Sequence, residues 1–114
     1  MNKKNLRRKL DEIELLEDNW NGYGANSFND ETIKRAHKVI DYLEDRWEDP
    51  AIVPSDIGIQ FEWDTKGKSL EIYIDEEIDA IGFLKVVGDS IEDWEEGLFS
   101  DYDKINYFVN WLYE

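Results

Sequence analysis

The stretch IGIQFEWDTKGKSLEIYID, residues 57–75, contains two runs in which apolar and polar side chains alternate. In the first run the apolar side chains occupy every second position: Ile57, Ile59, Phe61 and Trp63. The second run repeats the pattern with Leu70, Ile72 and Ile74. Alternation with a period of two is typical of a strand that buries one face, and Gly67 between the runs suits the positive φ of a hairpin turn. The stretch therefore predicts an antiparallel hairpin with strands over 57–63 and 69–75.

The chain after the hairpin is predicted to add to the sheet and then form a helix. Residues 80–87 are mostly apolar on both sides of the strand, which indicates a central strand. The acidic segment 89–100 is predicted to be exposed, with an edge strand around 94–99, because charge on an edge strand discourages aggregation. Residues 101–113 are predicted to form the last helix, with Ser100 and Asp103 in the arrangement of a capping box.

Two amphipathic helices are predicted before the hairpin. The first, over 2–18, has an apolar stripe at helical spacing: Leu6, Leu10, Ile13 and Leu16. The second, over 29–47, has another: Ile33, Ala36, Ile40, Leu43 and Trp47. Asp49-Pro50 ends it, because the residue before a proline avoids the helical region. The order of elements predicts one α+β domain over residues 1–114, an antiparallel sheet of three to four strands with helices packed on one face.

The segment NWNGYGA, residues 19–25, connects the two predicted helices. Its asparagines and glycines provide turn chemistry and left-handed backbone conformations, while Trp20 and Tyr23 provide large apolar areas. One interpretation is a structural corner that locks the helices together. The other is a contact surface or pocket mouth formed by Trp20, Tyr23 and Phe28.

Acidic residues outnumber basic residues by 28 to 13, which gives a formal net charge of −15. Residues 69–114 hold 13 of the acids, with Lys85 and Lys104 as their only bases, so this part has a net charge of −11. Direct nucleic-acid binding is disfavoured, since it depends on Lys and Arg. An acidic field attracts basic proteins instead. The alternative is that the acidity serves solubility alone.

The residue patterns of common catalytic and metal sites do not occur. There is no cysteine, and the single histidine, His37, lies among charged residues without a Ser-His-Asp arrangement. No HExxH or EF-hand spacing and no glycine-rich phosphate loop is found. We therefore expect no enzyme activity, no metal site and no cofactor. Glu62 lies mid-strand beside aromatic residues, and with a strand neighbour such as Glu71 it forms the candidate carboxylate pair for hydrolysis.

Several motifs occur in a familiar order: NWNGYGA (19–25), a helix, the link Ile52-Val53-Pro54, GIQFEW (58–63) and LEIYID (70–75). This order resembles a widespread group of small bacterial and phage-type proteins over residues 5–87. The matching positions are Trp20, Gly22, Gly24, Ala25, Pro54, Gly58, Glu62 and Trp63. The resemblance implies the fold and no mechanism. It also implies that NWNGYGA and the first strand form one unit, in which Glu62 accepts hydrogen bonds from loop N–H groups or an indole.

The charge predicts a non-enzymatic acidic interaction protein. It would bind and inhibit a basic, nucleic-acid-handling protein, as an antitoxin or a phage anti-defence inhibitor that mimics nucleic-acid charge does. The predicted partner-binding residues are Glu92, Asp93, Trp94, Glu95, Glu96, Asp101 and Asp103.

Two other interpretations remain open. One is a small-ligand-binding protein or hydrolase with a pocket between the NWNGYGA loop and the Glu62 strand, formed by Trp20, Gly22, Tyr23, Gly24, Gln60, Glu62 and Trp63. The other is a homodimer formed through an exposed apolar stripe. No apolar run approaches the roughly 18 residues of a membrane span, and no signal peptide is visible. A cytoplasmic protein without membrane contact is therefore expected.

Overall fold

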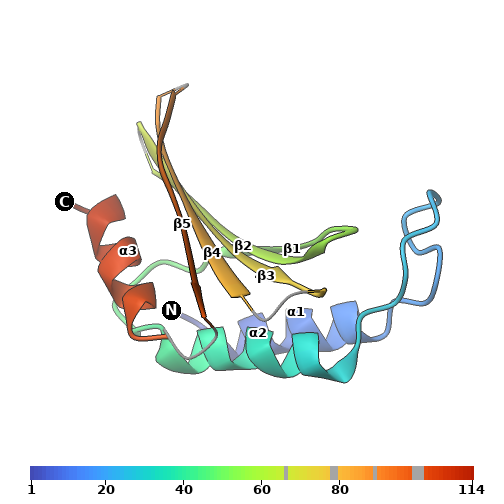
Figure 1. Cartoon of the computed structure of the whole chain (residues 1–114). Coiled ribbons are helices and arrows are strands. Elements are labelled where there is room, and N and C mark those ends of the chain that lie inside the picture. The colour runs from blue at the N-terminus through green and yellow to red at the C-terminus, as the bar shows by residue number, and fades with distance from the viewer. Residues whose placement is uncertain (66, 78–79, 89, 99–101) are drawn as a thin grey trace.

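A computed structural model of the chain describes residues 1–65, 67–77, 80–88, 90–98 and 102–114, and for 90–98 it describes the backbone alone. Helices α1 (Lys3–Glu14) and α2 (Asp30–Tyr42) come first. The strands follow: β1 (Ala51–Pro54), β2 (Gly58–Thr65), β3 (Lys68–Asp75), β4 (Ala80–Val87) and β5 (Ser90–Leu98). Helix α3 (Lys104–Leu112) comes last. Figure 1 shows α1 and α2 side by side beneath the sheet, with α3 standing at one side.

The strands form one antiparallel sheet in the order β1-β2-β3-β4-β5. The α+β class and the antiparallel sheet with helices on one face are thereby confirmed, and β4 lies inside the sheet as its apolar sequence predicts. The sequence pattern did not reveal β1, because four residues are too few to show alternation. Pro54 is tolerated there since one side of an edge strand needs no ladder hydrogen bond.

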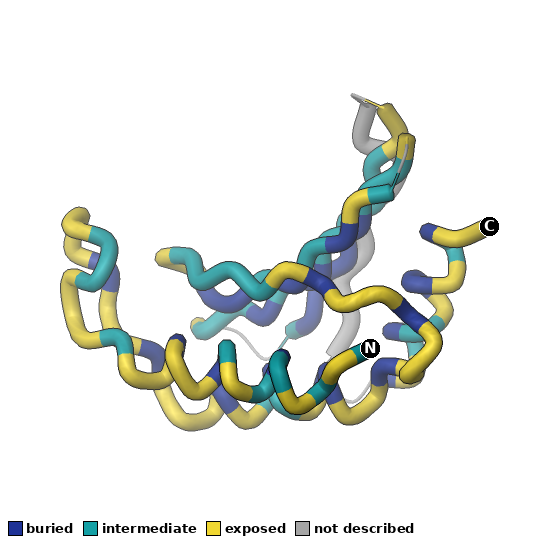
Figure 2. Tube along the Cα trace, turned by 180° about the vertical axis from the view of Figure 1, so that it is seen from behind, coloured by how far each residue is buried: buried dark blue, intermediate teal, exposed yellow. Residues whose placement is uncertain are grey.

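The two faces of the sheet differ. The helix face carries the buried strand residues: Ile59, Phe61, Trp63, Leu70, Ile72, Ile74, Ile81 and Phe83. The alternate positions form the open face, on the side away from the helices. Phe83 stacks on Phe108 of α3 with ring centroids 4.2 Å apart, and Figure 2 shows the buried parts of the helices and strands turned toward one another. The core therefore lies between the helix face and the three helices.

Helix α1 ends at Glu14, earlier than the predicted residue 18. Its last hydrogen bonds shorten to three-residue steps, from Leu15 N–H to Glu12 O at 3.2 Å. Asn19 then adopts a φ of 65°, which is outside the helical region. Asp18 and Asn19 use their side chains to accept backbone N–H groups of the α1–α2 connection, a competition with helix formation that is typical of Asp and Asn.

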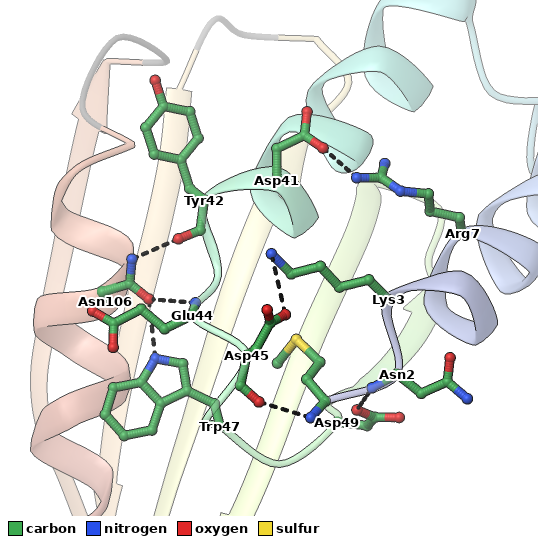
Figure 3. Close-up of polar contacts among 11 residues, drawn as sticks. Asn2, Lys3, Arg7, Asp41, Tyr42, Glu44, Asp45, Trp47, Asp49 and Asn106 are labelled. Carbon is green, nitrogen blue, oxygen red and sulfur yellow. Dashed lines mark hydrogen bonds and ion pairs between the residues drawn. The ribbon is translucent and has the colours of Figure 1, made fainter.

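Helix α2 ends at Tyr42 rather than at 47, because Leu43 is extended with φ −65° and ψ 132°. The side chain of Asn106 in α3 provides hydrogen-bond partners for backbone groups at the end of α2 (Figure 3). Its Nδ2 donates to Tyr42 O at 2.6 Å. Its Oδ1 accepts from Glu44 N–H at 3.1 Å and from the Trp47 indole N–H at 3.0 Å. The break allows both Leu43 and Trp47 to be buried.

The N-terminus is fastened to the segment between α2 and β1 (Figure 3). The Met1 amino group donates to Asp45 O at 2.8 Å, and Asn2 N–H donates to the Asp49 carboxylate at 2.7 Å. Lys3 Nζ lies 3.7 Å from the Asp45 carboxylate. The start of α1 is therefore held beside the segment that leads into the sheet.

Helix α3 begins at Lys104, later than the predicted residue 101. Residues 102 and 103 form a turn in which Ile105 N–H donates to Tyr102 O at 3.1 Å. Ser100 of the predicted capping box lies outside the described residues. Asp103 occupies the N-cap instead of a position inside the helix, and its side chain caps no N–H group of α3. The expected helix start at residue 101 is therefore wrong.

Candidate functional site

Four carboxylates lie on the open face, and no basic side chain does so in the described part of the sheet. They belong to β2 and β3, at positions that alternate with the buried residues: Glu62, Asp64, Glu71 and Asp75. We call them the open-face acids. The open face also carries Gln60 and Tyr73, which are direct cross-strand partners, and Ser69, whose hydroxyl donates to the Asp64 carboxylate at 2.6 Å.

Glu62 and Glu71 are also direct cross-strand partners. Glu76 N–H donates to Ile57 O at 2.9 Å, so the alternation of the ladder places the Glu62–Glu71 pair where no backbone bonds form and side chains come closest. Burial, and then the charges of Glu71 and Asp64, raises the pKa of Glu62. The pair is therefore a point of like-charge repulsion that an approaching cation relieves.

Tyr73 fixes the position of Glu71, since its hydroxyl donates a hydrogen bond to the Glu71 carboxylate. Burial, and then this bond and the charges of Glu71 and Glu62, raises the pKa of Tyr73. The phenol therefore stays protonated and remains a donor at neutral pH. Among the described side chains, Glu62 has no such donor.

Both lysines of the described sheet, Lys68 and Lys85, lie on the helix face and contact α3. Lys68 Nζ donates to Trp111 O at 3.1 Å and lies 5.0 Å from the centre of the Trp111 ring. Lys85 Nζ lies 5.2 Å from the ring centres of both Phe108 and Trp111, within cation–π range. Because both ammonium groups are on the other side of the sheet, neither of them neutralises the open-face acids.

The NWNGYGA loop is closed by its own polar groups. Asn19 N–H donates to Ala25 O at 2.6 Å, and Gly24 N–H donates to Asn19 Oδ1 at 2.7 Å. Asn21 Oδ1 accepts from the N–H groups of Tyr23 and Ala25. Gly22 and Gly24 both have positive φ, the conformation that glycine adopts without strain. The loop thus has the structural corner geometry that was one of its two interpretations.

The aromatic side chains of the loop differ in their environments. Trp20 is half-buried, with its indole N–H donating to Asn26 O at 3.0 Å and its ring 5.9 Å from that of Phe28. Tyr23 is 92% exposed. Trp20 and Phe28 therefore belong to the packed base of the connection, and Tyr23 is free for contact with other molecules.

The expectation that Glu62 and the NWNGYGA loop form one unit is wrong. No hydrogen bond joins Glu62 to residues 19–25, all of which the structure describes, because Glu62 lies on the open face. The carboxylate that ties the α1–α2 connection to the sheet is Glu76, which accepts the Asn29 N–H at 2.9 Å. The sequence pattern gave no sign of this role, since Glu76 is one of three consecutive acids, residues 75–77, that indicate an exposed turn.

The pocket predicted between the loop and the Glu62 strand is not formed, because its residues divide among three places. Trp63 is buried on the helix face and donates its indole N–H to Glu48 O at 2.9 Å. Gln60 and Glu62 lie on the open face. The loop residues lie in the α1–α2 connection, which extends away from the sheet in Figure 1.

Close packing explains why a glycine stands at position 58 of the matching motif. A Cβ added at this position would lie 1.8 Å from Ile74 O. The motif positions Gly58 and Trp63 therefore serve close strand pairing and core packing.

The predicted partner-binding segment forms an edge of the sheet. Strand β5 starts at Ser90, earlier than the expected 94, and pairs Asp93 with Lys85, Trp94 with Leu84 and Glu96 with Gly82. The side chains of Glu92, Asp93, Trp94, Glu95 and Glu96, and all of Asp101, lie outside the described part. Asp103 is exposed at the start of α3. The backbone thus places this acidic sequence beside the open face, at its β4 side.

The chain matches no protein-family model, no curated protein and no solved structure. Within the described residues, no group of three or more His, Cys, Asp or Glu side chains is arranged to hold a metal ion. Among the described helices, none has the length and apolar content that crossing a bilayer requires.

Proposed function

We propose that the protein is a non-enzymatic acidic interaction protein that binds a basic protein partner through the open face and the adjoining edge strand β5. One observation carries the proposal: the open-face acids have no basic counterpart in the described sheet, since Lys68 and Lys85 are held on the helix face. The proposal includes a cytoplasmic location and no direct contact with nucleic acid.

The distribution of charge along the chain supports the same surface. Residues 51–101, which span the sheet, contain 14 acidic and three basic residues, a net charge of −11. Eight of the 13 basic residues belong to α1 and α2, which lie on the other side of the sheet. The negative field is therefore directed away from the helices, and a field of one sign speeds the approach of a partner of the opposite sign.

The repulsion between Glu62 and Glu71 adds a thermodynamic reason. A basic side chain that lies between the two carboxylates removes the repulsion and gains two ion pairs, so part of the binding free energy is already stored in the free protein. Proteins that bind phosphate backbones carry rows of Lys and Arg. A partner of this class would find on the open face the charge of its nucleic acid, and the contact would block its groove.

Affinity capture with matched charge variants tests the proposal. The wild-type protein, Glu62→Lys/Glu71→Lys and the control Glu14→Lys/Glu17→Lys are immobilised and exposed to lysate of the native host at low and high salt. Both variants replace two glutamates with lysines and therefore change the net charge equally. Glu14 and Glu17 are exposed residues of α1 and the α1–α2 connection, away from the open face. We expect a basic, nucleic-acid-binding protein to bind the wild type and the control at low salt, and to be lost with the open-face variant. Equal capture by both variants would show that the open face is not the binding surface.

A further inference from the structure

A small cleft opens at the end of the sheet, between the α1–α2 connection and the turns that follow β1 and β3. It has a volume of about 170 Å³ and is lined by Asn26, Phe28, Asp56, Ile57, Glu76 and Glu77. We call it the end cleft. The open-face acids do not line it, so it is a separate feature of the surface.

Two hydrogen bonds of Glu76 hold the walls of the end cleft in place. Its backbone N–H donates to Ile57 O at 2.9 Å, which joins the two turns of the sheet. Its carboxylate accepts the Asn29 N–H at 2.9 Å, which joins the β3–β4 turn to the start of α2. The cleft is therefore fixed before any ligand arrives, and this lowers the entropic cost of binding.

The lining combines an apolar wall with an acidic rim. Ile57 is 56% exposed, which is unusual among the described isoleucines, and the buried Phe28 also lines the cleft. Asp56 and Glu77 are exposed carboxylates, and neither has an ion-pair partner among the described residues. No Lys or Arg occurs in residues 51–65 or 69–84, so nothing in these segments neutralises the rim.

The size and chemistry of the end cleft fit one long cationic side chain. Ligand pockets for drug-sized molecules have volumes of about 300–1,000 Å³, which exceeds the volume found here. Lysine and arginine place an apolar stem along apolar surface and keep the charged head among polar groups. Ile57 and Phe28 offer a surface for the stem, and Asp56, Glu76 and Glu77 offer acceptors for the head.

We infer that the end cleft binds a lysine or arginine side chain of the basic partner. The inference rests on the proposed function and adds a specific anchor to it: the open face attracts the partner, and the end cleft holds one of its side chains. Interfaces commonly obtain most of their affinity from a few such anchors.

A titration followed by NMR tests the anchor. The probe is the peptide acetyl-Gly-Arg-Gly-amide, added to ¹⁵N-labelled protein at low salt, and the matched neutral probe has citrulline in place of arginine. We expect the arginine peptide to shift the amide signals of Phe28, Ile57, Glu76 and Glu77, and the citrulline peptide to leave them unchanged.

Three variants make the result specific. Asp56→Asn/Glu77→Gln should raise the Kd of the arginine peptide by at least about fivefold, since two ion pairs are weakened. Ile57→Ser, which leaves the charge unchanged, should also raise it, by about threefold. The control Glu14→Gln/Glu17→Gln removes the same charge elsewhere and should change Kd by less than about twofold. Dispersed amide spectra confirm that each variant is folded.

The outcomes separate this inference from the proposed function. Shifts confined to the open face, or equal weakening by the cleft variant and the control, overturn the anchor and leave the proposed function standing. The anchor is also overturned, and the proposed function stands, if capture of a basic partner requires Glu62 and Glu71 but is unchanged by Asp56→Asn/Glu77→Gln. Failure to detect any cationic peptide on the protein at low salt counts against both.

Discussion

Glu62 and Glu71 face each other across β2 and β3 at the ladder position where side chains come closest, and no basic residue of the described sheet lies between them. Like charges placed directly opposite each other destabilise a sheet. The free protein therefore maintains an unfavourable contact on its open face, which is expected of a surface that serves binding rather than stability.

The first prediction is that Glu62→Gln stabilises the isolated protein at neutral pH. The substitution keeps the shape of the side chain and removes its repulsion with Glu71. Repulsion between like charges in a cross-strand pair destabilises a sheet by on the order of 0.5 kcal/mol. Because the pKa of Glu62 is raised from its ordinary value of 4.5, its folded form binds more protons than its unfolded form just above that pH. The contribution of Glu62 to stability therefore falls as pH rises through this window.

Thermal melts of wild type and Glu62→Gln between pH 4 and pH 8 check this prediction. The difference in Tm should grow as pH rises above the ordinary value of 4.5 and then level off. A variant that melts below the wild type at pH 7 would mean that the Glu62 carboxylate makes a stabilising contact.

The second prediction concerns Asn106, which joins α3 to the end of α2. Asn106→Ala should lower the free energy of unfolding by about 2–3 kcal/mol, because it leaves the Trp47 indole N–H and the Tyr42 carbonyl without their partner. Asn110→Ala, one helical turn later and exposed, is the matched control and should change stability by less than about 0.5 kcal/mol. Urea denaturation measures both, and similar losses for the two would contradict the role of Asn106.

The third prediction is that Gly58→Ala prevents normal folding. An added Cβ would lie 1.8 Å from the backbone oxygen of Ile74, and backbone atoms of a paired strand cannot move away without breaking the ladder. We expect a loss of more than about 3 kcal/mol. Gln60→Ala, in the same strand but on the open face, serves as control. Circular dichroism of a folded Gly58→Ala protein with near wild-type Tm would contradict this close approach.

The fourth prediction uses the one buried side-chain polar atom that lacks a partner in the described part of the chain, Thr32 Oγ1. Thr32→Val keeps the shape and removes the unbonded hydroxyl, so stability should rise by up to about 1 kcal/mol. Thr32→Ser keeps the hydroxyl and loses the buried methyl group, so stability should fall. A Val variant less stable than wild type would indicate that the hydroxyl has a bonding partner.

The alternating runs around Phe61 and Ile72 were sufficient to predict the hairpin, the buried face and the α+β class. The helix ends could not be predicted, because α2 stops where Asn106, far along the chain, offers hydrogen bonds that replace those of the helix. The helical stripe continued through Leu43 and Trp47, which are buried without being helical.

The candidate site was predictable in its charge and not in its arrangement. Composition indicates an acidic surface, and alternation in β2 and β3 places Glu62 and Glu71 on the same face. The pairing with the NWNGYGA loop was expected from motif order, which contains no distance information. The end cleft depends on turns from two hairpins meeting at Glu76, a contact set by sheet register, which local pattern does not determine.

The most direct test of the central claim is the salt dependence of the Kd for the captured basic partner, measured with wild type, Glu62→Gln/Glu71→Gln and Glu14→Gln/Glu17→Gln. The open-face variant should bind more weakly and with a smaller dependence on salt, because the ion pairs that release counterions are lost, while the control should follow the wild type. If the open-face variant and the control have the same Kd at every salt concentration, the open face does not bind the partner and its acidity serves only to keep the protein in solution.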